Sequence, residues 1–306
     1  MLGASGANAD GKKIAVFTKN NTNPYFQTVR LGADSAARML NASVTHFVPT
    51  KPDGIPEQMS QIEDVVVRKP DTIVFIPVDY KAMVPGVEKI NKAGIPVVNF
   101  TDRSEGGKFV AYVGADDYTL GLETARQLLK AIGGKGNVVI LEGVRGSLTN
   151  IDRLRGFNAA PKEFPNVKLL ASQPANYQRL QALQVTENLM QSHLQIDGVI
   201  AANDAMALGA LEALDAAKRK ALAVGINGTK EAINAIKEGR MLATCDYNGF
   251  RQGCLGTMVA IRHLRKQPTP AEIVLLASVV DKSNCQPLDM PAEKRVCPKW
   301  KDMVKG

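Results

Sequence analysis

The segment Val97-Val98-Asn99-Phe100-Thr101-Asp102-Arg103 is an apolar run that ends in a carboxylate beside a guanidinium. The preceding Ala93-Gly94-Ile95-Pro96 is typical of a helix end and a turn that leads into a buried strand. In an open parallel sheet, ligands bind in the crevice outside the carboxyl ends of the strands. A carboxylate accepts hydrogen bonds and a guanidinium donates a planar set of them, so the pair matches a row of hydroxyl groups. Asp102 and Arg103 are therefore candidate ligand residues, and the plain alternative is a charge pair on a solvated loop.

Strands and helices alternate on both sides of this segment. Buried-strand patterns occur at residues 13–17, 44–48, 71–77 and 109–113, and helical spacing of apolar residues at 25–42, 56–69 and 81–93. Strands that alternate with helices of this length predict βαβ units and a parallel sheet.

The same pattern then starts again. Strands are expected at 137–141, 167–172, 197–202, 221–226 and 241–245, and helices at 150–164, 177–192, 205–216 and 230–237. The offset between equivalent residues is nearly constant: Ile14 and Val138 are 124 residues apart, and Asp71 and Asp197 are 126 apart. The repeat predicts an α/β fold of two similar doubly wound lobes, with the ligand site in the cleft between them.

A further helix at 250–265 and one strand at 273–280 follow the second repeat. This surplus suggests that the chain returns to complete the first lobe. We expect an N-terminal lobe of residues 12–115 plus 247–277 and a C-terminal lobe of residues 116–246 plus 278–300. The chain would then cross between the lobes near residues 114–117, 244–248 and 277–281.

Composition and motifs exclude several classes of function. No apolar run is long enough to span a membrane, and the net charge of +8 comes from scattered Lys and Arg rather than a dense basic block, so no nucleic-acid partner is expected. There is no G-x-S-x-G, H-E-x-x-H or Walker A sequence, and the three histidines are dispersed. We therefore expect no catalysis, no metal site and no cofactor.

Cysteines and the N-terminus bear on the cellular compartment. Cys285 and Cys297 flank a Pro-rich tail with little core of its own, and we expect a disulfide between them, which favours an oxidising compartment. Cys245 and Cys254 are either two buried thiols or a second bridge. Residues Ala7-Asn8-Ala9 have the A-x-A form of a processed signal, with a remnant of cloning or a disordered end as alternatives.

Six segments resemble a known family. They are Asn23-Pro24-Tyr25-Phe26, residues 99–103, Gly143-Val144-Arg145-Gly146-Ser147, residues 152–157, residues 202–209 and Val224-Gly225-Ile226-Asn227-Gly228. Taken in order, over about residues 13–281, they are similar to the periplasmic solute-binding proteins of the ribose-binding type, which serve sugar ABC transporters. The resemblance implies that three hinge strands let the lobes close on a sugar.

The resemblance also implies a set of ligand residues. They are Asn23, Tyr25, Phe26, Asp102, Arg103, Ser147, Arg153, Asn203, Asn227 and Tyr247. Asn227 stands where the ribose binders usually have aspartate, and Tyr247 where they usually have glutamine, so another pentose, a deoxy sugar or a sugar alcohol is expected in place of ribose. Asn203 also fits a helix cap, and Asn227 before Gly228 fits a turn.

A binding protein of this type implies a sugar or polyol ligand, a membrane permease as partner, a chemoreceptor as a second partner, a monomeric state, and a periplasmic location reached through a signal peptide not present in this chain. Two alternatives stay open. One is the ligand-sensing core of a LacI-type repressor, although the residues before Ile14 are too few for a helix-turn-helix. The other is a binder of a non-sugar signal such as a quorum molecule.

Overall fold

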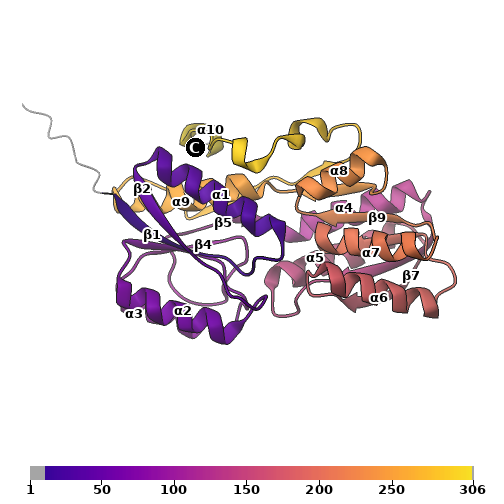
Figure 1. Ribbon diagram of the computed structural model, residues 1–306, viewed down its shortest axis with the longest axis horizontal. Coiled ribbons are helices and arrows are strands. Elements are labelled where there is room, and N and C mark those ends of the chain that lie inside the picture. Colours follow the sequence, from indigo (N-terminus) through magenta and orange to yellow (C-terminus); the bar gives the residue numbers. More distant parts are fainter. Residues whose placement is uncertain (1–10, 305–306) are drawn as a thin grey trace, which may run out of the picture.

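The computed structural model describes residues 11–304, which form two α/β lobes side by side (Figure 1). Each lobe is built on a six-stranded sheet. The first has the order β11-β5-β4-β3-β1-β2 and contains β1 (Lys12–Phe17), β2 (Ala42–Phe47), β3 (Thr72–Phe75), β4 (Val97–Phe100), β5 (Ala111–Ala115) and β11 (Glu272–Leu275). The second has the order β12-β10-β9-β8-β6-β7 and contains β6 (Lys135–Glu142), β7 (Asn166–Pro174), β8 (Gly198–Ala201), β9 (Leu222–Ile226), β10 (Ala243–Asp246) and β12 (Ser278–Val280).

The two strand orders are the same once β1–β5 are matched to β6–β10, which confirms the predicted repeat. All neighbouring strands of the first sheet are parallel. In the second sheet only β12 is antiparallel, to β10. The expected fold class of two doubly wound lobes is therefore confirmed.

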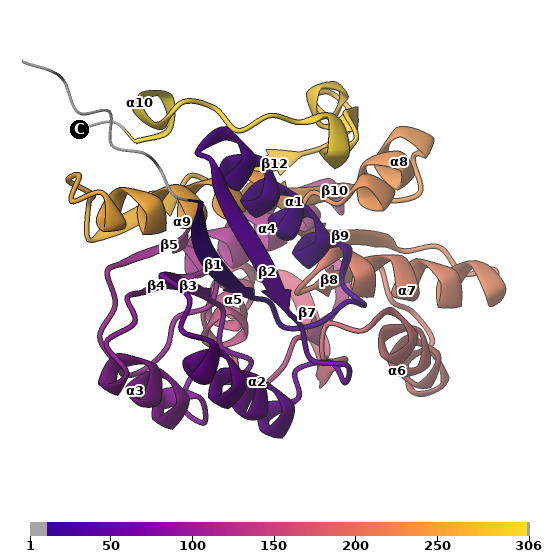
Figure 2. The same ribbon diagram turned by 60° about the vertical axis from the view of Figure 1, so that its left-hand side comes forward.

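Helices cover both faces of the first sheet (Figures 1 and 2). Successive side chains of a strand point to opposite faces, and both faces here are apolar. Ile14 and Val16 of β1 belong to the core beneath α1 (Pro24–Met39) and α9 (Gly249–Leu264). Ala15 and Phe17 belong to a separate core beneath α2 (Ile55–Arg68) and α3 (Val84–Lys92). This is why β1 is a continuous apolar run.

Helices α1 and α9 pack closely because each has a glycine at the contact. A Cβ on Gly32 would lie 2.1 Å from the carbonyl oxygen of Phe250, and one on Gly253 would lie 2.0 Å from that of Val29. The second lobe has an equivalent pair, α4 (Asp117–Ala131) and α5 (Leu148–Ala159), with Gly156 at the contact. Gly32 and Gly156 are 124 residues apart, the same offset as the first strands.

The remaining helices of the second lobe are α6 (Arg179–Ser192), α7 (Asp204–Ala216) and α8 (Lys230–Glu238), with a 3-10 turn η1 (Ala160–Glu163) after α5. Helix α4 is absent from the elements expected from the sequence pattern. It begins at Asp117, and the N-cap Asp116, which directly follows β5, accepts a hydrogen bond from the Thr119 N–H with its side chain.

The chain crosses between the lobes at residues 115–117, 246–249 and 275–278. The last crossing differs from the expected single strand at 273–280. The apolar run is divided between β11, which pairs with β5, and β12, which pairs with β10. The alternation of apolar and polar residues in a strand does not reveal this division, because β11 and β12 are both strands and follow each other closely.

The tail departs from the expected C-terminal lobe of residues 278–300. The turn η2 (Gln286–Asp289) lies against α8, but η3 (Ala292–Lys294) lies against α1 and α10 (Trp300–Met303) against α9. The end of the chain therefore packs on the first lobe (Figure 2).

The predicted Cys285–Cys297 disulfide is wrong. Cys297 is bonded to Cys254 of α9, with 5.7 Å between their Cα atoms. Cys285 is a buried free thiol at the start of η2, beside the second lobe, whereas Cys297 has already reached α1 and α9. Sequence proximity of the two tail cysteines gave the wrong pair because the tail changes lobes between them. Cys245 of β10 is the other free cysteine.

Candidate functional site in the cleft between the lobes

A narrow cleft with about 30 Å³ of free space lies between the lobes, outside the carboxyl ends of the strands. It is lined by Lys19, Asn20, Asn23, Tyr25, Phe26, Asp53, Thr101, Asp102, Ser147, Thr149, Arg153, Tyr177, Asn203, Asn227 and Tyr247. Nine of the ten ligand residues expected from the sequence are among them, and Arg103 is the exception.

Three of the lining side chains also cap helices that point their N-termini at the cleft. Asn23 caps α1 by accepting from the Tyr25 N–H at 3.1 Å, Ser147 caps α5, and Asn203 caps α7 by accepting from the Met206 N–H at 2.9 Å. Capping fixes where each side chain sits, because the cap hydrogen bond sets its rotamer. The cap role and the place in the cleft are thus not exclusive for Asn203.

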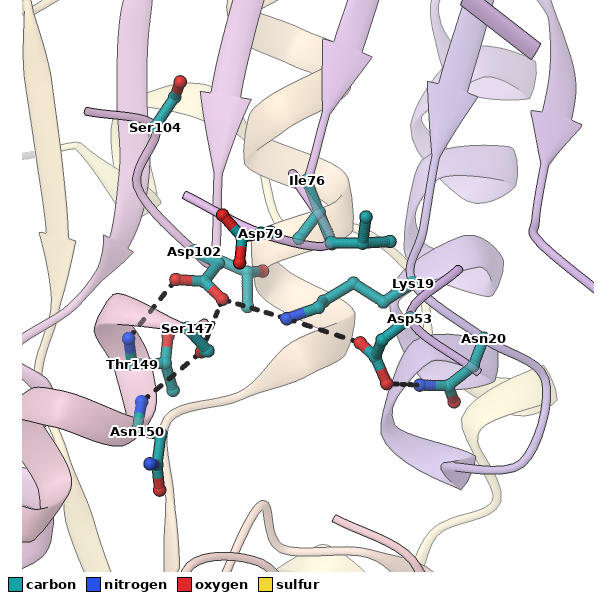
Figure 3. Close-up of polar contacts among 12 residues, drawn as sticks. Lys19, Asn20, Asp53, Ile76, Asp79, Asp102, Ser104, Ser147, Thr149 and Asn150 are labelled. Carbon is teal, nitrogen blue, oxygen red and sulfur yellow. Dashed lines mark hydrogen bonds and ion pairs between the residues drawn. The ribbon is translucent and has the colours of Figure 1, made fainter. Parts of the chain in front are cut away.

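Lys19 is the centre of a buried charge cluster in the first lobe (Figure 3). Its Nζ donates to Asp102 Oδ2 at 3.1 Å and lies 3.5 Å from Asp53 Oδ1. Burial lowers the pKa of Lys19, but the two carboxylates outweigh it and the pKa is raised. Burial raises the pKa of Asp53, although Lys19 opposes this. The ammonium is therefore charged at neutral pH and holds Asp102 and Asp53 together.

Asp102 also joins the two lobes. Its Oδ2 accepts from the Ser147 hydroxyl at 2.6 Å and its Oδ1 from the Thr149 N–H at 3.2 Å, both at the start of α5 (Figure 3). Nearby, the Tyr80 N–H donates to the Gly146 carbonyl at 3.1 Å. The described structure is thus a closed arrangement, in which the first lobe contacts the second directly.

Arg153 is the positively charged residue that the second lobe contributes to the cleft lining, and its side chain is almost fully buried. Its Nε donates to Asp117 Oδ1 at 2.9 Å and its Nη1 to the Ala202 carbonyl at 2.7 Å. Burial raises the pKa of Asp117 to about 6, although Arg153 opposes the rise. Asp117 begins α4, directly after a crossing between the lobes, so the guanidinium is oriented by a hinge segment.

Aromatic rings line the cleft from both lobes and the hinge. Tyr25 and Tyr247 are stacked with centroids 5.1 Å apart, and Phe26 meets Tyr25 edge-on at 5.4 Å. The Tyr247 hydroxyl donates to Asn227 Oδ1 at 3.4 Å. Tyr177 contributes a fourth ring from the second lobe. Flat apolar faces beside hydrogen-bonding groups suit the two-sided character of a sugar ring.

Arg103, which was expected to be a ligand residue, does not line the cleft. Its guanidinium lies 3.5 Å from the centre of the Tyr112 ring and forms an ion pair with Glu272, and its side chain is 45% exposed. The cause is Thr101, a β-branched residue with a φ of +61°. After this turn Asp102 lines the cleft, whereas Arg103 lines a neighbouring pocket with Tyr112, Glu272 and the start of α5.

Six lining residues lie outside the set expected from the sequence: Lys19, Asn20, Asp53, Thr101, Thr149 and Tyr177. Lys19 and Asn20 lie two and three residues after the end of β1 at Phe17, so the rule that ligands bind at the carboxyl ends of strands would have found them. Asp53 and Tyr177 come from loops whose path the sequence does not show. The sequence has no motif that identifies these two residues as part of a ligand site.

Four buried polar atoms of the lining have no hydrogen-bond partner among residues 11–304. They are Arg153 Nη2, Tyr177 OH, Thr149 Oγ1 and Asp53 Oδ1, of which Asp53 Oδ1 has an ion pair with Lys19 at 3.5 Å. Unpaired buried polar groups are costly and need an explanation. Donors and acceptors that converge on one cleft are explained by a polar ligand.

Metal binding and membrane insertion are two further properties on which the described residues bear. Over residues 11–304 there is no cluster of His, Cys, Asp or Glu arranged to hold a metal ion. Within the same range, none of the helices has the length and apolar character to cross a membrane.

The sequence matches the model of the periplasmic binding protein domain over residues 14–268. The chain belongs to the periplasmic binding protein family. Such proteins bind solutes for transport and are not enzymes, which confirms the expected lack of catalysis. The family resemblance inferred from the six motifs is confirmed as well.

Individual relatives of this periplasmic binding protein are similar over most of their length. It is 30% identical over 284 residues to the xylitol-binding protein of Mycolicibacterium smegmatis, covering 92% of this chain and 80% of that one. It is 31% identical over 267 residues to the ribose import binding protein RbsB of Haemophilus influenzae, covering 87% and 90%. A solved periplasmic solute-binding protein of an ABC transporter from Actinobacillus succinogenes, with bound D-allose, is 34% identical with a TM-score of 0.86, covering 90% of this chain and 99% of that one.

Proposed function

We propose that this periplasmic binding protein captures an uncharged monosaccharide or sugar alcohol in the cleft between its lobes. The observation that carries the proposal is the balance of charge in the cleft. Its charged lining residues are Lys19 and Arg153, which are cationic, and Asp53 and Asp102, which are anionic. A sugar acid or sugar phosphate would leave one sign of buried charge uncompensated, which is costly.

The unpartnered groups support the same ligand class. Arg153 Nη2 is a donor, and the hydroxyls of Tyr177 and Thr149 both donate and accept. A polyol offers several hydroxyls with the same two-way capacity. The stacked Tyr25 and Tyr247 rings supply the apolar surface that the C–H faces of such a molecule need.

The ligands of the relatives named above support an uncharged sugar or sugar alcohol as the ligand of this protein. The relatives named above bind xylitol or ribose, or hold D-allose. Each of these ligands is uncharged and carries several hydroxyl groups. Which of them fits best depends on Asn227 and Tyr247, the two positions that depart from the ribose-binding pattern.

Capture in this account is the first step of import. The protein works as a monomer outside the cytoplasm. The ligand favours the closed form because it contacts both lobes only when they meet. The closed form then docks on the membrane permease of an ABC transporter. A chemoreceptor that reads the same closed form is a second partner.

A thermal-shift panel tests the proposal. It contains ribose, arabinose, allose, xylitol and deoxy sugars, with ribose 5-phosphate and a sugar acid as charged counterparts. A ligand at a hundred times its dissociation constant adds about 2.7 kcal/mol to the free energy of unfolding, so at least one neutral member should raise the melting temperature clearly. Stabilisation by the charged members alone would overturn the proposal, and stabilisation by none would favour a non-sugar signal.

A further inference from the structure

The tail after β12, residues 281–304, forms a strap that contacts both lobes (Figures 1 and 2). Its first part is fixed to the second lobe. Asp289 of η2 accepts from Lys237 Nζ at 2.7 Å and forms an ion pair with Lys230, both on α8. Lys230 also donates to the Asp289 carbonyl at 2.9 Å.

The last part of the strap is fixed to the first lobe. The Cys254–Cys297 disulfide ties it covalently to α9, and the Cys297 N–H donates to Ser35 Oγ of α1 at 3.4 Å. The Arg262 guanidinium of α9 lies 4.4 Å from the centre of the Trp300 ring. This attachment is much stronger than the ion pairs at the other end, because it includes a covalent bond.

The middle of the strap lies against the back of the ligand cleft. Met290, Ala292 and Arg295 line a small cavity of about 30 Å³ together with Tyr25 and Asn227, which also line the cleft. Arg295 donates to the carbonyl of Met290 at 3.0 Å and so holds the strap in a bent shape. The strap is thus one layer away from the ligand.

Geometry limits how far the two attachments can separate. Asp289 and Cys297 are eight residues apart, so even a fully extended chain between them reaches only about 28 Å. The segment is shorter than this limit because it contains the turn η3 and the Arg295 hydrogen bond. Separation of α8 from α9 would first break these local contacts.

We propose that the strap is a fourth connection between the lobes, which restrains their opening and shifts the free protein toward the closed form. The three crossings of the hinge permit rotation, whereas the strap adds a distance limit between elements of different lobes. A contact that is satisfied only in one of two states shifts the population toward that state. The strap lies after the residues matched by the family model, which end at residue 268. The proposal rests on the proposed function only in requiring lobes that open and close.

Two variants release the strap at different ends. The double substitution Cys254→Ser with Cys297→Ser removes the covalent tie to α9, and Asp289→Asn removes the ion pairs to α8. Asp215→Asn is the matched control for the second, because Asp215 forms a surface ion pair with Arg240 away from the strap. Far-ultraviolet circular dichroism verifies folding, and emission of Trp300, the single tryptophan, reports on strap docking in the double variant.

The measurement is small-angle X-ray scattering of the ligand-free proteins. Both strap variants should show a larger radius of gyration than the wild type, and Asp215→Asn should not. An unchanged radius in Asp289→Asn and in a folded double variant whose Trp300 emission has shifted to the red would overturn the proposal. Because no ligand is present, failure of the sugar assignment does not affect this result.

Discussion

At the scale of single residues, the cleft depends on a few buried polar groups whose partners lie far apart in the sequence. Lys19 compensates two carboxylates, Asp102 reaches across to the second lobe, and Arg153 is oriented by Asp117. These groups make the closed site specific, since each charge has a partner and a few donors and acceptors are left for the ligand.

Replacement of Lys19 should destabilise the protein strongly. Lys19→Met leaves Asp102 and Asp53 buried together without their cation, and breaking a buried ion pair on one side costs about 3–5 kcal/mol. Urea unfolding at neutral pH measures the loss. Lys81→Met, at an exposed pair with Glu105, should cost far less, and an equal loss in both variants would contradict the role of Lys19.

Tyr177→Phe should have opposite effects on stability and on binding. The buried Tyr177 hydroxyl has no partner among the described residues, so its removal should leave the free protein as stable as before or up to about 1 kcal/mol more stable. The same change should weaken binding of the best ligand from the thermal-shift panel. Parallel urea unfolding and calorimetric titration test it, and a less stable variant with unchanged affinity would show that the hydroxyl serves the fold.

Most of the residues that line the cleft could be predicted from the sequence, but the contacts that hold their side chains in place could not. Asn23, Ser147 and Asn203 were found through motifs, and the structure shows that each is held by a helix cap. Arg103 was expected in the cleft but lines a neighbouring pocket, after a left-handed backbone at Thr101 that no sequence pattern reveals. Lys19 was overlooked although it lies only two residues after the end of the first strand.

At the scale of elements, buried carboxylates connect the strands and helices of the second lobe. Asp204 begins α7, accepts from the Thr244 hydroxyl of β10 at 2.6 Å and accepts from the Thr229 N–H before α8 at 2.8 Å. Burial raises its pKa to about 6, although these hydrogen bonds oppose the rise. One side chain thus links α7, β10 and the segment before α8, and the free-energy cost of burying its ionised carboxylate depends on pH.

The pH dependence of this link has a definite sign. A carboxyl group whose pKa is higher in the folded than in the unfolded state favours folding when protonated, so its contribution is present below about pH 4 and is lost as pH rises to about 6. Asp204→Asn removes this contribution. The free energy of unfolding of the wild type relative to the variant should therefore fall between about pH 4 and pH 6. A constant or rising difference in urea unfolding across this range would contradict the assignment.

At the scale of the whole molecule, the internal repeat explains why the fold was predictable and the tail was not. Two copies of the same strand order, with matching helix pairs, were visible as a constant offset in the sequence. The strap belongs to neither copy, so nothing in the repeat indicated its path. For the same reason the cysteine nearest in sequence was a poor guide to the partner of Cys297.

We propose that the ligand binds in the cleft, that Arg153 contacts it directly and that Arg103 lies outside its binding site. The measurement is titration calorimetry of the best panel ligand into the wild type, Arg153→Lys and Arg103→Lys. Both variants keep the charge and lose the planar set of donors. Loss of a charge-assisted hydrogen bond costs about 1.5–3 kcal/mol, so Arg153→Lys should weaken binding by about tenfold or more, whereas Arg103→Lys should stay within about twofold of the wild type. A large loss of affinity in Arg103→Lys with normal affinity in Arg153→Lys would show that the ligand binds at Arg103 and not at Arg153.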